Sequence, residues 1–459
     1  MAETIQFLGA AETVTGSKHL LTLNGHKVLV DCGLFQGGKD LRARNWQPLP
    51  VDLHEIEAMI VTHAHLDHIG YIPRLVKEGF RSPIYCTRAT LGLARISLPD
   101  SGHIQEEDAR HHNRHGTDHD PALPLYTELE ARDCLSLFRP IKYDTLTDLP
   151  GGAKFRFLPA GHILGSAFAE IYFQSGERIL MSGDLGRFNT PIIKDPTMID
   201  YAEFLVVEST YGDRLHSHEP VLPKLEELLG WAMENRSMVL VPSFSIGRTQ
   251  ELLYYLKQLE EQGKLPNIPI YVDSPMGLSA TELYENAVEE RDPESEMKFN
   301  LHDNPLEPKG LTMIRSADES KRLNQTRGPA FIIAGSGMAN GGRIVHHLLH
   351  HLSEPSTLVI FTGYQAEGTM GRMILEGATH VRILGQEVEV HARIERLNAL
   401  SAHADQAEIM QWLRGFKAPP RRTFIVHGEP PAQAALRDKI VSELEWDVVI
   451  PHWKETAAL

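Results

Sequence analysis

Four side chains that can bind a metal ion fall within six residues of this chain, directly after an apolar, strand-like run. The run AMIV leads through Thr62 into His63, His65, Asp67 and His68. In extended backbone His63 and His65 point to the same side, whereas Asp67 and His68 begin a helical segment and turn toward a neighbouring position. Imidazole nitrogen and carboxylate oxygen are donors that Zn²⁺ prefers. This spacing suits two adjacent metal ions better than one, so the fold must bring further donors to this loop.

Other donors occupy the same kind of position. Asp31 ends the run KVLVD, His162 comes just after KFRFLP, Asp184 ends RILMSGD, and His427 follows TFIV. Taken alone, each would more often be a turn or capping residue. Open α/β sheets place functional groups past the carboxyl ends of their strands. The shared position beside the His63 loop therefore favours a common metal site.

Length, charge and cysteine content limit the class of protein. The chain has 459 residues, a formal charge of −16 and 42% hydrophobic residues, which indicates two or three ordinary globular domains. Its three Cys are too few and too scattered for a disulfide framework. The N-terminus has no secretory pattern, and no apolar run reaches the ~18 residues of a membrane helix. We expect a cytoplasmic protein without membrane contact, and the acidic charge argues against a non-specific nucleic-acid coat protein.

The pattern of apolar and polar residues changes near residues 208 and 390. Residues 1–208 carry many short strand-like runs, whereas 209–390 alternate helical patterns with continuous apolar strands, which is typical of a buried parallel sheet. Residues 391–459 hold the run NALSAHAD and two helical patterns on either side of TFIVHGE. We predict an α/β fold with domains at 1–208, 209–390 and 391–459.

Several motifs carry a family resemblance. DCGLFQG, THAHLDH, AGHILGSA and SGDLG resemble, in this order, the motifs of the metallo-β-lactamase superfamily of dinuclear metallohydrolases. Glu208 in VEST, His403 in SAHAD and His427 in VHGE resemble the three extra motifs of its β-CASP branch. The likeness is strongest to the RNA-cleaving subgroup related to the endonuclease that cuts pre-mRNA before polyadenylation. DNA-directed members generally lack the final His, so His427 favours RNA.

The resemblance implies an αββα metallo-β-lactamase sandwich built from both chain ends, with an inserted parallel-sheet α/β domain, the β-CASP domain. It also implies two Zn²⁺ per chain. The first ion would be bound by His63, His65 and His162. The second would be bound by Asp67, His68 and His427. Asp184 would bind both ions. Asp31 would fix a ligand histidine through the other nitrogen of its ring.

The expected chemistry is hydrolysis of phosphodiester bonds in single-stranded RNA. Two adjacent Zn²⁺ can hold water as hydroxide near neutral pH, and such a nucleophile can attack phosphorus. His403 is the expected general acid for the leaving oxygen, because histidine titrates in a suitable range. Glu208 would orient His403 and favour its protonated form. With Asp184, these two residues form the predicted catalytic set.

A glycine-rich run, AGSGMANGGR, could cradle a substrate phosphate through its backbone N–H groups. Tight packing of a strand against a helix explains such a run about equally well. The expected phosphate contacts are Ser336, Gly337, Arg343, Ser401 and Arg248. Arg248 could instead be a structural ion-pair partner.

Two further histidine-rich segments are interpreted without a metal. The first holds His111, His112, His115 and His119 and is expected to be a mobile surface insertion. The second, RIVHHLLHHL, predicts a helix that carries His346, His347, His350 and His351 on its surface. Cys32 follows Asp31 on the opposite face of a strand, so we expect it to be buried packing.

Three other functions are open from the sequence. They are a DNA nuclease of the same branch, a non-nucleolytic hydrolase such as a thioester hydrolase or lactamase, and a non-catalytic RNA-binding scaffold. The second leaves SAHAD and VHGE unexplained, and the intact donor positions disfavour the third. Endonucleolytic and 5′-exonucleolytic cleavage fit the sequence equally well, and a homodimer is compatible with it.

Overall fold

The computed structural model describes residues 3–115, 121–216, 219–301, 303–363, 365–397 and 400–459. The chain forms two compact units. Unit 1 consists of Met1–Thr190, Lys194–Leu215 and His403–Leu459, and unit 2 of Pro191–Ile193 and His216–Ala402. Unit 1 is therefore assembled from both ends of the chain. Among the described residues, no helix has both the length and the apolar character that crossing a membrane requires.

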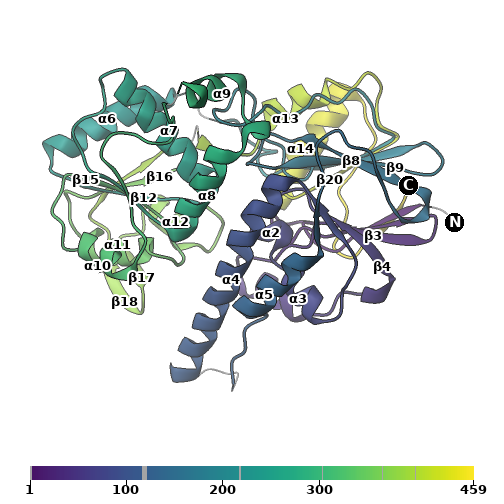
Figure 1. Cartoon of the computed structure of the whole chain (residues 1–459), viewed down its shortest axis with the longest axis horizontal. Helices are drawn as coiled ribbons and strands as arrows, with labels where there is room; N and C mark the ends of the chain where they lie inside the picture. Colours follow the sequence, from purple (N-terminus) through teal and green to yellow (C-terminus); the bar gives the residue numbers. More distant parts are fainter. Residues whose placement is uncertain (1–2, 116–120, 217–218, 302, 364, 398–399) are drawn as a thin grey trace. The chain divides into compact units, whose positions relative to one another are not determined.

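Unit 1 contains two seven-stranded sheets, of which the first includes β3 and β4 and the second β8, β9 and β20 (Figure 1). The first sheet has the order β22-β1-β2-β3-β4-β5-β6, and β3 to β6 run parallel. Its strands are β1 (Thr4–Phe7), β2 (His19–Leu23), β3 (His26–Val30), β4 (Ile56–Ile60), β5 (Ile84–Cys86), β6 (Phe138–Pro140) and β22 (Thr456–Ala458).

The second sheet of unit 1 has the order β21-β20-β11-β10-β9-β8-β7. Strands β10, β11, β20 and β21 are parallel, and β9 runs antiparallel to both β8 and β10. It follows that β8 points the same way as β10. The strands are β7 (Thr147–Asp148), β8 (Lys154–Pro159), β9 (Ala167–Tyr172), β10 (Arg178–Met181), β11 (Phe204–Glu208), β20 (Arg422–Val426) and β21 (Val448–Val449).

The apolar faces of these two sheets form one core. Alternate residues of a strand point to the same face, so Ile5 and Phe7 of β1 meet Phe155 and Phe157 of β8 in a single buried cluster. Phe7 also packs against Phe424 of β20, with ring centres 5.2 Å apart. Sheet-on-sheet packing of this kind explains why the first part of the chain is rich in short strands.

Helices cover the outer faces of the two sheets. Trp412 of α13 and Leu436 of α14 join Leu205 and Ile425 in a cluster on the second sheet, and both helices lie beside β20 in Figure 1. The helices of unit 1 are α1 (Lys39–Ala43), α2 (Leu66–Ile69), α3 (Ile72–Lys77), α4 (Arg88–His115), α5 (Glu128–Cys134), α13 (Gln406–Leu413) and α14 (Pro430–Leu444). The result is the αββα sandwich that the motifs predict.

Unit 2 contains a fully parallel six-stranded sheet with apolar clusters on both faces. Its order is β14-β13-β15-β12-β16-β19, and a hairpin of β17 and β18 is separate. The strands are β12 (Met238–Pro242), β13 (Ile270–Asp273), β14 (Leu311–Met313), β15 (Ala330–Ala334), β16 (Leu358–Phe361), β17 (His380–Ile383), β18 (Gln386–Glu389) and β19 (Arg393–Arg396). The helices are α6 (Val221–Glu234), α7 (Arg248–Glu261), α8 (Pro275–Asn286), α9 (Pro293–Asn300), α10 (Ala317–Leu323), α11 (Ile344–His351) and α12 (Met370–Leu375).

The two ends of the chain are joined within unit 1. Strand β1 pairs with β22, with Ile5 opposite Ala457, and β20 pairs with β11, with Glu208 opposite Val426. Figure 1 accordingly shows the two termini close together. This pairing carries the loop after β20 to the same sheet edge as the loops after β8, β10 and β11.

Candidate metal centre

One edge of unit 1 receives the predicted donor side chains. They lie past the carboxyl ends of the strands, where the chain leaves the sheet: Asp31 after β3, His63 to His68 after β4, His162 after β8, Asp184 after β10 and His427 after β20. Within the first sheet β3 and β4 are parallel, and within the second β8, β10 and β20 point the same way, so each sheet brings its own donors to one edge. The fold brings together residues that are far apart in the sequence: His63 and His427 are separated by 364 positions.

The loop after β4 is held by the loop after β3. The N–H of Cys32 donates to the carbonyl of His68 (2.7 Å), and the N–H of Ser17 donates to the carbonyl of Asp67 (2.8 Å). A Cβ atom on Gly33 would lie 1.5 Å from the carbonyl oxygen of Asp67, so only glycine permits this approach. The motif DCG therefore fixes the histidine loop as well as ending its own strand.

Two histidines meet one oxygen of Asp184, and a third lies beside both of them. The Nε2 atoms of His63 and His162 each lie 3.3 Å from Asp184 Oδ2. Both also approach His65 Nδ1, at 3.2 and 3.1 Å. These four side chains form one group of donor atoms that are mutually within 4.8 Å.

A second group meets the other oxygen of Asp184. His68 Nε2 lies 3.2 Å from Asp184 Oδ1 and 3.3 Å from His427 Nε2. His427 Nε2 lies 3.2 Å from Asp67 Oδ2. Asp184 thus faces one group with each of its oxygens.

The spacing of these donors matches a metal coordination sphere. With a Zn–N or Zn–O distance of about 2.05 Å, tetrahedral donors lie about 3.3 Å apart. Most of the closest separations within the two groups are 3.1–3.3 Å. Asp184 is buried, and among the described residues neither of its side-chain oxygens accepts a hydrogen bond. Burying a carboxylate that accepts no hydrogen bond costs free energy, and a bound cation would remove that cost.

Asp31 orients two of these histidines. Its Oδ2 lies 2.7 Å from His68 Nδ1 and accepts a hydrogen bond from Thr62 Oγ1 (2.8 Å). Thr62 Oγ1 also lies 3.2 Å from His63 Nδ1. One carboxylate therefore aims Nε2 of His68 directly and Nε2 of His63 through the hydroxyl of Thr62. A carboxylate that holds the far nitrogen of a ring is the usual support of a metal-binding histidine.

His427 has a similar support. Thr210 Oγ1 lies 3.0 Å from His427 Nδ1, and it also donates to the carbonyl of His427 (3.2 Å). His427 itself has a positive φ of 49° and is anchored by its N–H, which donates to the carbonyl of Ala10 (2.7 Å). Thr62 and Thr210 are the supporting residues that the sequence interpretation missed. Their only signal in the sequence is closeness to a predicted site residue: Thr62 directly precedes His63, and Thr210 follows Glu208 by two positions.

Burial sets the protonation state of the first donor group. It lowers the pKa of His65 to about 3, and it also lowers the pKa values of His63 and His162. Neutral imidazole is the form that binds a metal. Burial alone would raise the pKa of Asp184, but the surrounding histidines, with His427 first, hold it well below its usual range. The centre thus keeps its carboxylate ionised.

His403 and Glu208 form a buried pair beside Asp184. His403 Nδ1 lies 3.0 and 3.1 Å from the two oxygens of Glu208, and 3.9 Å from Asp184 Oδ2. Glu208 is completely buried and also accepts hydrogen bonds from the N–H groups of Leu185 (2.7 Å) and Thr210 (3.2 Å). Burial, the largest single effect, would lower the pKa of His403, but the charge of Glu208, the charges of Asp184 and Asp67 and the hydrogen bond to Glu208 together raise the pKa to about 9.

The predicted phosphate contacts all belong to unit 2. Ser336 and Gly337 lie in the glycine-rich loop between β15 and α11, and Ser336 Oγ is buried without a hydrogen-bond partner among the described residues. Ser401 is buried. The two arginines have carboxylate partners: Arg343 pairs with Asp273 (2.6 Å), and Arg248 pairs with Glu251.

The prediction that the histidines of α11 lie on the helix surface is wrong for two of them. His347 and His351 are buried, whereas His346 and His350 are exposed. His347 Nε2 contacts Asp273 Oδ2 (2.7 Å), so the helix turns this histidine face inward. His111 and His112 are exposed at the end of α4, and the side chain of His115 and all of His119 fall outside the described part of the chain. Cys32 is buried, as expected.

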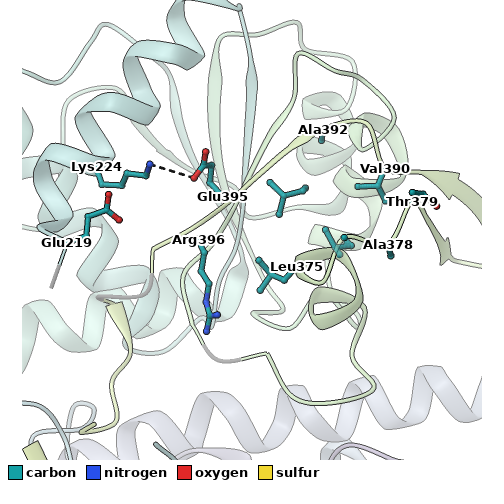
Figure 2. Close-up of a pocket in the computed structure, with 12 residues that line it drawn as sticks. Glu219, Lys224, Leu375, Ala378, Thr379, Val390, Ala392, Glu395 and Arg396 are labelled. Carbon is teal, nitrogen blue, oxygen red and sulfur yellow. Dashed lines mark ion pairs between the residues drawn. The ribbon is translucent and has the colours of Figure 1, made fainter. Parts of the chain in front are cut away.

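A hollow of about 450 Å³ lies in unit 2, beside strand β19 (Figure 2). Lys224 and Glu395 form an ion pair at its wall (3.7 Å), and Arg396 and Leu375 also line it. None of the predicted site residues lines this hollow. The donors of the metal centre, in contrast, belong to unit 1.

Family models match three parts of the chain. The model of the Beta-lactamase superfamily domain matches residues 26–241, that of the Beta-Casp domain residues 249–374, and that of the Zn-dependent metallo-hydrolase RNA specificity domain residues 387–451. The matches follow the order that the motifs predict.

Similar proteins are found along nearly the whole chain. Ribonuclease TTHA0252 of Thermus thermophilus is 38% identical, over 93% of this chain and 94% of that protein. The RNase J-like protein of Methanocaldococcus jannaschii is 31% identical, over 93% of this chain and 92% of that protein. Transcription termination factor FttA of the same organism is 30% identical over 93% of this chain, which corresponds to 67% of the longer FttA.

A solved structure shares the fold. It is the crystal structure of a protein of unknown function from Enterococcus faecalis V583, with a TM-score of 0.55, 14% sequence identity and complete coverage of both chains.

Proposed function

Because this chain belongs to the RNA-cleaving subgroup of the β-CASP branch of the metallo-β-lactamase superfamily, we propose that it is a zinc-dependent ribonuclease acting on single-stranded RNA. The observation that carries the proposal is the position of Asp184, whose two oxygens each face a separate group of imidazole and carboxylate donors. A relative named a ribonuclease, 38% identical over most of the chain, supports RNA as the substrate. The cytoplasm is the proposed location.

The proposed centre holds two Zn²⁺. The first would be bound by His63, His65 and His162, the second by Asp67, His68 and His427, and Asp184 would be shared. The separations of 3.1–3.3 Å between most neighbouring donors support this division. When bound, two zinc ions lower the pKa of water toward neutrality and place positive charge beside the phosphate oxygens.

His403 is the proposed general acid. Its Nδ1 faces the carboxylate of Glu208, so Nε2 is the nitrogen that would deliver a proton to the departing 3′-oxygen. The raised pKa keeps the imidazole protonated at neutral pH, as an acid must be before it acts. Glu208 would position His403 and hold its charge without touching the substrate.

The proposed phosphate contacts are Ser336, Gly337, Arg343, Ser401 and Arg248. The buried and unpartnered Oγ of Ser336 supports its assignment best, because such a hydroxyl can donate to a phosphate oxygen. The guanidinium of Arg343 also donates to the carbonyl groups of Ile314 (3.4 Å) and Arg315 (3.0 Å). Its contribution would therefore include holding the loop in shape.

The test is a cleavage assay with zinc-loaded protein. A single-stranded RNA is labelled at its 3′ end and prepared with either a 5′-phosphate or a 5′-hydroxyl, and Asp184→Ala is the control. We expect the wild-type protein to cut the RNA and Asp184→Ala to be inactive and depleted of zinc. The same protein is tested on single-stranded DNA and on a thioester. The proposal would be rejected if the RNA stayed intact while the protein turned over the single-stranded DNA or the thioester.

A further inference from the structure

A column of alternating cations and aromatic rings runs through unit 1. Lys18 Nζ lies 4.9 Å from the ring centre of Tyr71 and 4.4 Å from that of Phe35. The guanidinium carbon of Arg44 lies 5.4 Å from Phe35 and 4.1 Å from the ring centre of Trp453. Lys454 Nζ lies 4.1 Å from Trp453. We call these residues the cation–aromatic column: Tyr71, Lys18, Phe35, Arg44, Trp453 and Lys454.

The inner end of the column is a buried cation. Lys18 is almost completely buried, and its ammonium group donates to the carbonyl oxygens of Gly33 and Gly16. Among the described residues it has no carboxylate within ion-pair distance. Burial lowers the pKa of Lys18 to about 8, so the amine is still mostly charged at pH 7. This end adds positive potential and is enclosed by its neighbours.

The outer end presents two cations to solvent. Arg44 is half-buried, Lys454 is exposed, and within the described ranges neither forms an ion pair with a carboxylate. Two nearby acids have other partners: Glu455 accepts from the N–H of His452 (2.7 Å), and Glu12 contacts His452 Nδ1 (3.1 Å). In a chain with a net charge of −16, two adjacent cations without acidic partners form a distinct positive feature.

The two outer cations are held in place by packing. Trp453 donates from Nε1 to the carbonyl of Leu8 (3.0 Å), which fixes the ring between Arg44 and Lys454. Lys454 has a positive φ of 69°, a conformation that non-glycine residues rarely adopt. Its backbone N–H donates to the carbonyl of Phe7 (2.7 Å). A cation that is already ordered loses less entropy when it binds an anion.

Single-stranded polynucleotides fit this chemistry. Their binding sites combine cations for the phosphates with exposed aromatic rings on which bases stack. Trp46 follows Arg44 by two residues, is 54% exposed and has the guanidinium carbon of Arg74 6.0 Å from its ring centre, so an exposed ring lies close to Arg44 along the chain. The segment 39–46 contains Lys39, Arg42 and Arg44 against Asp40, a net charge of +2.

The surface is connected to the metal centre through a short piece of backbone. The carbonyl of Leu8 accepts from Trp453, and two residues later the carbonyl of Ala10 accepts from the N–H of His427. We propose that Arg44 and Lys454, with Trp46, form an RNA-binding surface that holds the phosphodiester backbone of a substrate strand outside the catalytic centre. The proposal rests on RNA being the substrate.

The test compares two double variants in RNA binding. Arg44→Gln/Lys454→Asn removes both charges, and asparagine tolerates the positive φ at position 454. The matched control Arg437→Gln/Lys439→Gln also removes two charges from unit 1, but these cations on α14 have carboxylate partners in Asp438 and Glu443. Binding of a labelled 20-nucleotide RNA is measured against salt concentration at 4 °C, and a denaturing gel confirms that the RNA is intact.

Two phosphate contacts on a single strand contribute about 1.4 to the slope of log Kd against log salt concentration. Such a slope corresponds to about 25-fold in affinity between 1 M and 0.1 M salt. We expect the Arg44/Lys454 variant to lose this amount, the control to stay near wild type, and Arg44→Lys/Lys454→Arg to keep most of the affinity. A wild-type slope in the first variant, or an equal loss in the control, would overturn the proposal. Melting temperatures verify folding. Because the readout is binding, a protein that binds RNA through this surface but cleaves none would refute only the proposed function.

Discussion

Replacing Glu208 by Gln tests how the charge of one buried carboxylate controls His403. The substitution keeps the shape of the side chain and one oxygen that can accept from the N–H of Leu185. It removes the negative charge that lies 3.0 Å from His403 Nδ1. Burial then acts on the imidazole with less opposition, so the pKa of His403 falls and its protonated form becomes scarce at neutral and alkaline pH.

The size of the effect follows from the distance. Two unit charges about 3 Å apart interact by about 5.5 kcal/mol at an effective dielectric constant of about 20. Even half of this energy lowers the ratio of protonated to neutral imidazole about 100-fold. With a pKa of about 9, His403 is about 90% protonated at pH 8 in the wild type. In the variant this share falls to about 10%, so we expect at least a roughly ninefold loss of kcat/KM at that pH.

The assay is the pH dependence of kcat/KM on a fluorogenic RNA, together with the zinc content of each protein. The raised pKa of His403 means that its acid form is lost as the pH rises through about 9, so the wild-type rate should decline there. The decline should begin at lower pH in Glu208→Gln, with zinc retained. Glu203→Gln is the control, since Glu203 also accepts a backbone N–H, from Arg178 (2.9 Å), just before the same strand. An unchanged profile would refute the electrostatic explanation, and lost zinc would make Glu208 a metal ligand or a structural support.

Three further outcomes can be measured. Removing the metal with a chelator should abolish RNA cleavage and lower the melting temperature, and adding Zn²⁺ back should restore both. The reason is that Asp184 without a metal is a buried carboxylate that accepts no hydrogen bond from the described residues. An unaltered melting temperature would contradict this. Thr62→Val should weaken zinc binding about 10- to 100-fold by cutting the link between Asp31 and His63, whereas Thr62→Ser should bind zinc normally; equal affinities would exclude the link. Asp273→Ala should lower the free energy of unfolding by about 3 kcal/mol in urea titrations, since it leaves the Arg343 charge without its partner; a change near zero would show that solvent replaces the carboxylate.

That these donor side chains lie together could be predicted from the sequence, because a local pattern marks each of them. Each donor follows an apolar strand, and parallel strands of one sheet end at a common edge, so His162 and Asp184 were expected to lie near each other. His63 follows a strand of the other sheet, and its place in the same group was expected from the shared position after a strand and from the family resemblance. The family resemblance added the assignment of His403 and Glu208, which apolar patterns alone do not mark. The two-layer sandwich followed from the density of short strands and from the motifs at both ends of the chain.

Other features depend on contacts that no local pattern encodes. The spacing of the histidines in α11 places pairs on each face, but which pair turns inward is decided by Asp273 at the end of β13. The hydroxyl of Thr62 gains its role only when β3 and β4 lie side by side. The cation–aromatic column joins positions 18 and 44 to position 453, and nothing in their spacing predicts that they meet.

The pairing of β20 with β11 has a consequence for the life of the molecule in the cell. A polypeptide emerges from its N-terminus at about 5–20 residues per second, so about 13–50 s separate the synthesis of His162 from that of His427. During that interval the nascent chain holds an incomplete set of donors. A chain built in this way completes its set of donors only after His427 has been synthesised and β20 has paired with β11.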